Sequence, residues 1–263
     1  MVFSETEILR AGSCDIYVSK AHRFGTDAVE LFEFVNSPPR PAGSKPVLTS
    51  SLKNKVVWDL CTGCGIIALL IAQAGAKSVY GCDIAKDAVS LFTRTAAASD
   101  LQITPLHADL KEISALFPRH RGTADVVTVN PPYFRGGSGL APATETARAA
   151  RTEILCDIKD VITAAGFLLK FGGRFAVCTV PDRLADTLCA MRAGGIEPKI
   201  LVNLVNCAEG KPNSAGDKLN SAGDKGAGQC GIISPWLCLI EGKSGGKPGM
   251  NVFIKQKDKK LEN

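Results

Sequence analysis

The sequence predicts an α/β fold, with a mostly parallel β-sheet, helices on both of its faces and an antiparallel edge. Two observations predict it. Short apolar segments that resemble strands alternate with segments that resemble helices along residues 56–193, which is typical of parallel sheets covered by helices. Three strand-like segments then follow without helices between them, at 199–205, 235–241 and 251–255. We expect these three to pair antiparallel at one edge of the sheet.

The region before this alternation predicts one short helix and a loop. Apolar residues recur at helical spacing up to Val35, and Thr26 or Asp27 is expected to cap the start of the helix. Proline and glycine are frequent in residues 37–44, which indicates a loop.

The first alternating elements are short and apolar. The strand 56–60 leads into an apolar helix, 64–75, which ends at glycine. A second strand, 78–82, precedes an Ala-rich helix at 86–99. We predict a third strand at 103–107 near a sheet edge, because the proline inside it cannot donate to a strand ladder.

The later elements follow the same alternation. A fourth strand at 125–129 precedes a glycine-rich loop. We predict a helix from about Thr152 to Lys170, ended by two glycines, and a fifth strand from Arg174 to Val180. A helix then begins at a proline and extends over 181–193, since proline is favoured in a first helical turn.

The composition fits one soluble domain. Of the 263 residues 45% are hydrophobic and 22% are charged, with a net charge of +5, so most of the chain is not disordered. The aliphatic run 66–72 is far shorter than the roughly 20 residues of a membrane helix. The N-terminus carries acids and no apolar stretch, so we expect no secretory signal, a cytoplasmic location and reduced cysteines.

A glycine-rich loop follows the strand 56–60. Gly63, Gly65 and Ala68 satisfy the pattern G-x-G-x-x-G/A, and Asp83 ends the next strand, where an acid can accept ribose hydroxyls. This pattern fits nicotinamide, flavin or any other adenosine-bearing cofactor. Asp59 favours S-adenosylmethionine, because a carboxylate repels a pyrophosphate but suits an ammonium and a sulfonium group. The alternative for Asp59 is a solvated strand end.

Two further features have competing interpretations. Asp109 follows the third strand and either accepts the adenine amino group or caps a helix. Cys61 and Cys64 form a C-x-x-C pair, which occurs in redox and zinc sites, but the sequence has no second pair. We therefore assign Cys61 to the cofactor loop and expect no metal. Ile84, which follows Asp83, is also expected to contact the cofactor.

The tetrapeptide Asn130-Pro131-Pro132-Tyr133 ends the fourth strand. The prolines stiffen the backbone and remove N–H donors, so the Asn side-chain oxygen and the Pro131 carbonyl remain as acceptors for both hydrogens of a planar amino group. Two such acceptors stabilise the positive charge that develops as the nitrogen is methylated. Tyr133, with Phe134 beside it, offers a face on which a planar base can stack. The alternative is a proline-rich turn.

With these motifs the sequence resembles the class I S-adenosylmethionine-dependent methyltransferases that act on exocyclic amino nitrogens. The match is narrower for the bacterial tRNA1(Val) (adenine(37)-N6)-methyltransferase family, which it resembles in segments from about residue 17 to 255. The resemblance implies a Rossmann-like fold with a seven-stranded sheet, S-adenosylmethionine as cofactor and adenine N6 in tRNA as substrate. It also implies that Thr26 and Asp27 help to close the cofactor site, and that Asn130 contacts the cofactor as well as the target.

The contacts to RNA are less clear from the sequence. Basic residues that could contact the substrate include Arg23, Arg148 and Arg151, together with lysines of the C-terminal tail such as Lys255. Each of these also fits an ordinary solvated charge. An adenine in a stacked stem-loop would have to be extruded to reach Tyr133. A monomer is favoured, and no membrane partner is expected.

We expect the chain to divide into a lid of residues 1–52 and a catalytic domain of residues 53–263. The hexapeptide Asn-Ser-Ala-Gly-Asp-Lys occurs at 213 and again at 220, so we interpret about 208–230 as a flexible insertion. Three alternatives remain. A protein glutamine methyltransferase of the release-factor type shares the tetrapeptide, a nicotinamide-dependent oxidoreductase shares the glycine loop, and a non-catalytic binding module could retain the fold.

Overall fold

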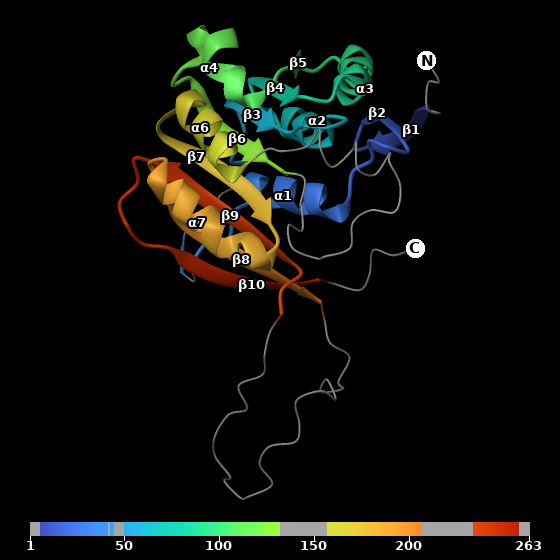
Figure 1. Cartoon of the computed structure of the whole chain (residues 1–263). Coiled ribbons are helices and arrows are strands. Elements are labelled where there is room, and N and C mark those ends of the chain that lie inside the picture. Colours follow the sequence, from blue (N-terminus) through green and yellow to red (C-terminus); the bar gives the residue numbers. More distant parts are fainter. Residues whose placement is uncertain (1–5, 42, 45–49, 132–156, 207–233, 258–263) are drawn as a thin grey trace, which may run out of the picture.

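The computed structural model describes residues 6–41, 43–44, 50–131, 157–206 and 234–257. Its centre is an eight-stranded sheet with helices on both faces, and a separate two-stranded hairpin lies near the N-terminus (Figure 1). Among the described helices none is long and apolar enough to cross a membrane. The expected insertion at 208–230 and residues 152–156 of the predicted helix lie outside the described residues.

The order of strands in the sheet confirms the predicted architecture. From one edge to the other the strands are β10 (Asn251–Lys257), β8 (Ile196–Asn206), β9 (Leu237–Ser244), β7 (Leu169–Thr179), β6 (Ala124–Val129), β3 (Val56–Leu60), β4 (Ser78–Asp83) and β5 (Ile103–His107). Within this sheet β9 runs opposite to its neighbours β7 and β8, and the other pairings are parallel. The strand that contains Pro105 is an edge strand, as predicted.

Three expectations about the strands and the helix before β7 were wrong. The sheet has eight strands rather than seven, and β10 pairs with β8 in parallel instead of antiparallel, because the chain after β9 returns across β8 before it pairs. The third error concerns the two glycines expected to end a helix. They lie inside β7, since α6 already ends at Leu168, and Gly172 adopts a φ of 77° beside a shift in the β6–β7 register. A glycine with positive φ allows such an irregularity within a strand.

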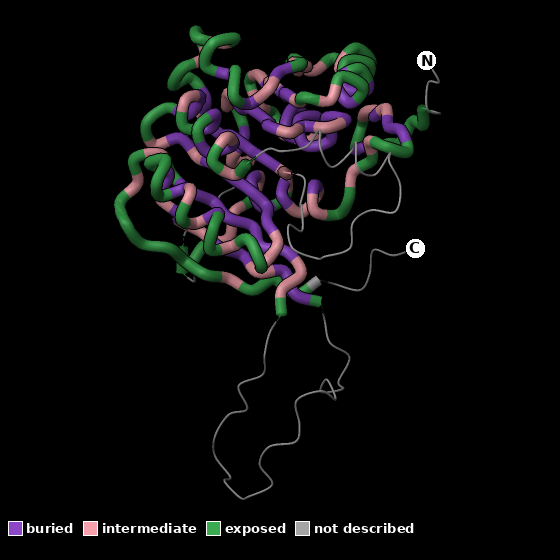
Figure 2. Tube along the Cα trace, in the orientation of Figure 1, coloured by how far each residue is buried: buried purple, intermediate pink, exposed green. Residues whose placement is uncertain are grey.

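Successive residues of the central strands point into two different cores. Val57 belongs to the core under α1 (Thr26–Asn36), α2 (Ile66–Gln73) and α3 (Lys86–Ala97), whereas Trp58 belongs to the core under α4 (Ile113–Leu116), α6 (Ile158–Leu168) and α7 (Leu184–Ala193). This alternation follows from the period of two residues in a strand. It leaves the sheet buried on both faces, which Figure 2 shows as a purple interior.

The described part of residues 1–52 is joined to the first core. The hairpin of β1 (Thr6–Ala11) and β2 (Cys14–Ser19) packs on α3, where the N–H of Tyr17 donates to the hydroxyl of Thr95 over 3.0 Å. Helix α1 buries Leu31, Phe34 and Val35. Its position is therefore fixed by packing.

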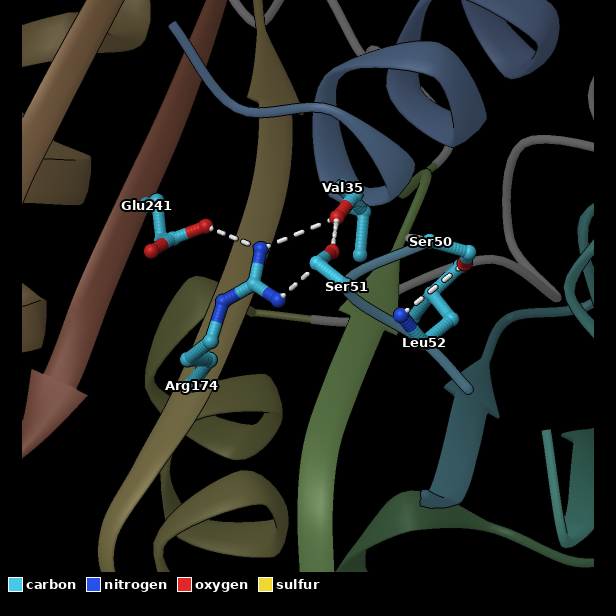
Figure 3. Close-up of polar contacts among 6 residues, drawn as sticks. All are labelled: Val35, Ser50, Ser51, Leu52, Arg174 and Glu241. Atoms are coloured by element: carbon cyan, nitrogen blue, oxygen red, sulfur yellow. Dashed lines mark hydrogen bonds and ion pairs between the residues drawn. The ribbon is translucent and has the colours of Figure 1, made fainter. Parts of the chain in front are cut away.

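A largely buried arginine side chain ties the end of α1 to the sheet (Figure 3). The guanidinium of Arg174 in β7 donates to the carboxylate of Glu241 in β9 over 2.6 Å. It also donates to the carbonyl oxygen of Val35 over 3.0 Å and to the hydroxyl of Ser51 over 3.1 Å. These contacts join α1, the segment before β3 and two strands at one point.

Candidate active site

Three of the predicted site residues lie at the same edge of the sheet. Asp59 and Asp83 stand at the carboxyl ends of β3 and β4, and Asn130 directly follows β6. Because β3 lies between β4 and β6, the chain reverses its direction of strand addition at β3. Ligands of open α/β sheets bind at this kind of switch point.

The loop between β3 and α2 depends on its glycines. Gly63 and Gly65 have φ values of 57° and 86°, and the non-glycine Cys61 also has a positive φ, 55°. A Cβ on Gly65 would lie 2.0 Å from the ring of Phe92. At Gly65 the loop therefore packs more closely on α3 than a side chain would allow.

Asp83 holds this loop in place. Its carboxylate accepts from the N–H of Gly63 over 2.8 Å and from the N–H of Ala85 over 2.9 Å, one bond on each oxygen. Each carboxylate oxygen can accept more than one hydrogen bond, so acceptor sites remain for the two hydroxyls of a ribose. Ile84 is 52% exposed beside it and offers an apolar surface.

Asp109 caps the start of a helix, which was the alternative to a contact with adenine. It precedes η1 (Leu110–Glu112), and its carboxylate accepts from the N–H of Lys111 over 2.9 Å. A carboxylate that accepts one hydrogen bond keeps further lone pairs, so its role toward adenine stays a prediction.

Asp59 is not a solvated strand end, because it is 0% exposed. Its two oxygens accept from the hydroxyls of Thr62 and Thr128 over 2.6 and 2.7 Å. Burial raises the pKa of Asp59 to about 7, and the negative charge of Asp83 acts in the same direction against the hydrogen bonds that lower it. Both hydroxyl donors are neutral. A positively charged ligand at this edge would therefore give the buried carboxylate a charged partner and favour its ionised form.

Asn130 connects the end of β6 to the N-terminal segment. Its side-chain Nδ2 donates to the carboxylate of Asp27 in the first turn of α1 over 3.0 Å. Its Oδ1 lies 2.9 Å from the thiol of Cys178 in β7. The structure thus brings Asp27 and Asn130 together, as expected for residues of one site, and Thr26 lies exposed at the start of the same helix.

Sequence reasoning missed the partners that hold these groups. Thr128 lies opposite Asp59 in the β3–β6 register, a relationship that the alignment of the two strands could have suggested. Thr62 lies inside the glycine loop itself. Cys178 lies in an apolar strand, and no sequence signal distinguishes it from other buried cysteines.

The predicted substrate residues are mostly outside the described part of the chain. This holds for Pro132, Tyr133, Phe134, Arg148 and Arg151, whereas Pro131 is described and half-buried. Arg23 is described and exposed, and it forms an ion pair with Glu7.

Lys255 is also paired, with Glu30 and Glu33 of α1 over 2.8 and 3.1 Å. Burial would lower the pKa of Lys255, but the two carboxylates outweigh it and raise this pKa. Its ammonium group is therefore engaged within the fold.

A cavity of about 480 Å³ lies between the C-terminal end of α1 and strands β8 to β10, with Phe34, Val202 and Phe253 in its wall. Within the described residues, no group of three or more His, Cys, Asp or Glu is arranged to hold a metal ion. The cavity is at the opposite end of α1 from Asp27 and is separate from the candidate active site.

Comparison with known families gave one match over the region that contains the site. The family model described as "Methyltransferase small domain" matches residues 42–178. This range includes the glycine loop, the strand ends and the tetrapeptide.

The similarity to curated relatives covers only part of the length of each relative. The tRNA1(Val) (adenine(37)-N6)-methyltransferase of Porphyromonas gingivalis is 32% identical over 169 residues, which are 63% of this chain and 62% of the relative. The protein of the same name from Aeromonas hydrophila is 33% identical over 52% of this chain and 56% of its own. The release factor glutamine methyltransferase of Mycolicibacterium smegmatis is 29% identical over 48% of this chain and 46% of its own length. The chain therefore spans about half to three fifths of these relatives.

Solved structures share the fold at low sequence identity. The 16S rRNA N2 G1207 methyltransferase (RsmC) of T. thermophilus superposes with a TM-score of 0.55 and 15% identity, over 91% of this chain and 50% of that chain. A predicted O-methyltransferase from Agrobacterium tumefaciens gives a TM-score of 0.54 and 16% identity, over 88% and 85%. These similarities establish the fold of this chain.

Proposed function

The chain belongs to the methyltransferase small domain family, whose model matches about half of its residues, and we propose that it methylates the exocyclic N6 of an adenine in tRNA. The cofactor of this family of enzymes, S-adenosylmethionine, supplies the methyl group. The observation that carries the proposal is the position of Asn130, which follows β6 at the switch point and is tied to Asp27.

The described residues fit this cofactor. Gly63 and Gly65 allow close approach of the backbone, and Asp83 keeps acceptor sites for the ribose hydroxyls. The buried Asp59 carries no positive partner among its hydrogen-bond donors. This arrangement suits a cofactor with positively charged groups and no phosphate. We further propose Thr26, Asp27, Cys61, Ile84 and Asp109 as cofactor contacts.

The chemistry proposed for the tetrapeptide follows from its acceptors. Oδ1 of Asn130 and the carbonyl of Pro131 would each take one hydrogen of the target amino group, which directs the nitrogen lone pair toward the methyl carbon. The new carbon–nitrogen bond forms as the carbon–sulfur bond breaks, and the nitrogen then loses a proton to water. Pro132 would stiffen this turn, and Tyr133 and Phe134 would stack on the base.

Two relatives favour RNA as substrate, and one favours protein. The relatives from P. gingivalis and A. hydrophila are named tRNA adenine-N6 methyltransferases, whereas the mycobacterial relative is named a release factor glutamine methyltransferase. We prefer tRNA because the first two matches have higher identity and cover more of this chain. A glutamine side chain is the second candidate, since its amide nitrogen also needs two acceptors. Membership of a methyltransferase family leaves the oxidoreductase alternative without support.

We also propose how the rest of the chain serves this reaction. Residues 1–52 would cover the cofactor, with Asp27 as their contact to Asn130. Arg23, Arg148 and Arg151 would contact phosphates of the tRNA, and the protein would act as a cytoplasmic monomer.

Methyl transfer to RNA and to protein can be tested in parallel. The purified protein is incubated with isotopically labelled S-adenosylmethionine and, separately, with total tRNA or with a release factor. The RNA is digested to nucleosides, and the protein is digested to peptides, before mass spectrometry. N6-methyladenosine carrying the label is the expected product. Label in glutamine alone would show that the substrate is a protein rather than tRNA. The absence of label from both would exclude the proposed activity on these substrates.

A further inference from the structure

A buried cysteine contacts the amide group that we place at the reacting nitrogen. Cys178 lies near the end of β7 and is 0% exposed, and its Sγ lies 2.9 Å from Oδ1 of Asn130. The carbonyl oxygen of Val129 is farther from the same sulfur, at 3.9 Å. A thiol is a weak donor, but a hydrogen bond in a buried site is stronger than the same bond in water.

The carboxamide of Asn130 is held from two sides. Its Nδ2 donates to Asp27, and its Oδ1 accepts from Cys178. A carboxylate accepts and does not donate, so a reversed amide would place Oδ1 against the carboxylate of Asp27 and the NH₂ group against the sulfur. The two partners together therefore select one orientation of the amide.

We infer that Cys178 is a positioning residue, which fixes Oδ1 of Asn130 toward the nitrogen that is methylated. This inference rests on the proposed function of Asn130. A carbonyl oxygen has two lone pairs, so the thiol leaves one of them for a hydrogen of the target amino group. Loss of orientation slows the chemical step rather than binding, so removal of the thiol lowers kcat and leaves KM unchanged.

The neighbouring strand offers a matched control. Cys238 in β9 is also 0% exposed, and its thiol also lies close to an asparagine oxygen, 3.3 Å from Oδ1 of Asn203. The two cysteines belong to different cores on opposite faces of the sheet. The variant Cys238→Ala therefore removes the same chemical groups without touching Asn130.

Steady-state kinetics with tRNA separate positioning from packing. For Cys178→Ala we expect kcat to fall about five- to tenfold, which corresponds to the loss of one hydrogen bond, with KM for tRNA and Kd for S-adenosylmethionine within about twofold of wild type. Cys178→Ser keeps a donor and is expected to retain at least about half of the activity. Cys238→Ala is expected to keep its kcat while Tm falls in both alanine variants. A kcat of Cys178→Ala equal to that of Cys238→Ala, or an equally slow Cys178→Ser, overturns the inference.

Infrared spectroscopy tests the contact without any substrate. The S–H stretching band of Cys178 is identified by its loss in Cys178→Ser, and a hydrogen bond lowers its frequency. We expect this band to move to higher frequency in Asn130→Ala and to stay unchanged in Asn203→Ala. An unmoved band in Asn130→Ala overturns the inference. A band that moves, in a protein that methylates a release factor instead of tRNA, supports the inference and overturns only the proposed RNA substrate.

Discussion

Nδ2 of Asn130 donates a hydrogen bond to the carboxylate of Asp27 over 3.0 Å, although 103 residues separate the two along the chain. One residue begins a helix of the N-terminal segment, and the other ends a central strand of the sheet. The contact makes the geometry of the proposed catalytic amide depend on where α1 packs. Changes in α1 should therefore be detectable in catalysis.

Substitution of Asp27 tests this dependence. In Asp27→Asn the carboxamide can present either an acceptor or a donor to Asn130, so the orientation of Asn130 is no longer selected. We expect kcat for tRNA methylation to fall about tenfold, as for loss of a hydrogen bond to a charged group, with a small change in Tm. Asp15→Asn is the control, since Asp15 is exposed and pairs with Arg10. Equal kcat values in the two variants would contradict the role of Asp27.

Removal of the Asn130 amide should affect catalysis more than cofactor affinity. We expect Asn130→Ala to lower kcat by about 10²- to 10³-fold, because a preorganised group at the reacting atom is lost. The Kd for S-adenosylmethionine, measured by calorimetry, should change by less than about fivefold. Asn203→Ala removes an asparagine that also lies beside a buried cysteine, and it should leave kcat near wild type. Nearly intact activity of Asn130→Ala would show that the mechanistic assignment is wrong.

Gly65 provides a test of the cofactor loop. Gly65→Ala combines a φ of 86° with a Cβ 2.0 Å from Phe92, so we expect a loss of about 3 kcal/mol in the free energy of unfolding, above the roughly 1–2 kcal/mol of the left-handed backbone alone. Gly195→Ala isolates the backbone cost, since Gly195 has a φ of 75° and nothing within 4 Å of its Cβ position. Urea unfolding of both variants measures the difference. An equal loss of stability would mean that the contact with Phe92 relaxes freely.

The outcome at this site shows which features were predictable from sequence. The strand and helix alternation, the glycine loop and the acids at the strand ends depend on local patterns, and the structure has them where they were expected. The direction of β10 and the continuation of β7 through Gly172 depend on pairing between distant strands. No local pattern encodes such pairing.

Contacts between site residues were harder to predict than the residues themselves. Asp27 and Asn130 were both identified, but their hydrogen bond follows from the packing of α1 on the sheet. For Asp59 the sequence left two interpretations, a solvated strand end or a cofactor contact. Neither of them predicts its burial. Asp59 is 0% exposed, and its oxygens accept from the hydroxyls of Thr62 in the glycine loop and Thr128 in β6.

The Arg174–Glu241 ion pair should contribute to stability because both side chains are largely buried, at 21% and 11% exposure. Arg174→Met leaves Glu241 without this partner, so we expect a loss of roughly 3 kcal/mol in the free energy of unfolding. Addition of Glu241→Gln should recover part of this loss, because the unpaired charge is removed. Arg183→Met breaks an exposed pair with Asp186 and should cost less than about 1 kcal/mol. Similar losses in Arg174→Met and Arg183→Met would contradict this account.

The raised pKa of Asp59 predicts a pH dependence of stability with a defined sign. Its pKa is 3.8 when unperturbed and about 7 in the fold, mainly through burial. Between these values the folded state holds a proton that the unfolded state has released, so the contribution of Asp59 to stability is present below pH 4 and lost as the pH rises through about 7. From pH 5 to pH 8 we expect the free energy of unfolding of the wild type to fall by about 2–4 kcal/mol relative to that of Asp59→Asn. Parallel pH profiles in urea unfolding would mean that Asp59 does not titrate in this range.

S-adenosylmethionine should reverse part of this loss. A cation near Asp59 favours its ionised form, so the ligand should stabilise the wild type more strongly at pH 8 than at pH 5, and the Tm shift at a fixed ligand concentration measures this. Asp59→Asn has no carboxylate to ionise, and its Tm shift should depend less on pH. S-adenosylhomocysteine is the matched ligand, because it keeps the ammonium group and lacks the sulfonium charge. The same pH dependence of the Tm shift with both ligands in the wild type would show that the sulfonium group is not the partner of Asp59. The ionisation of Asp59 would then depend on the ammonium group or on neither charge.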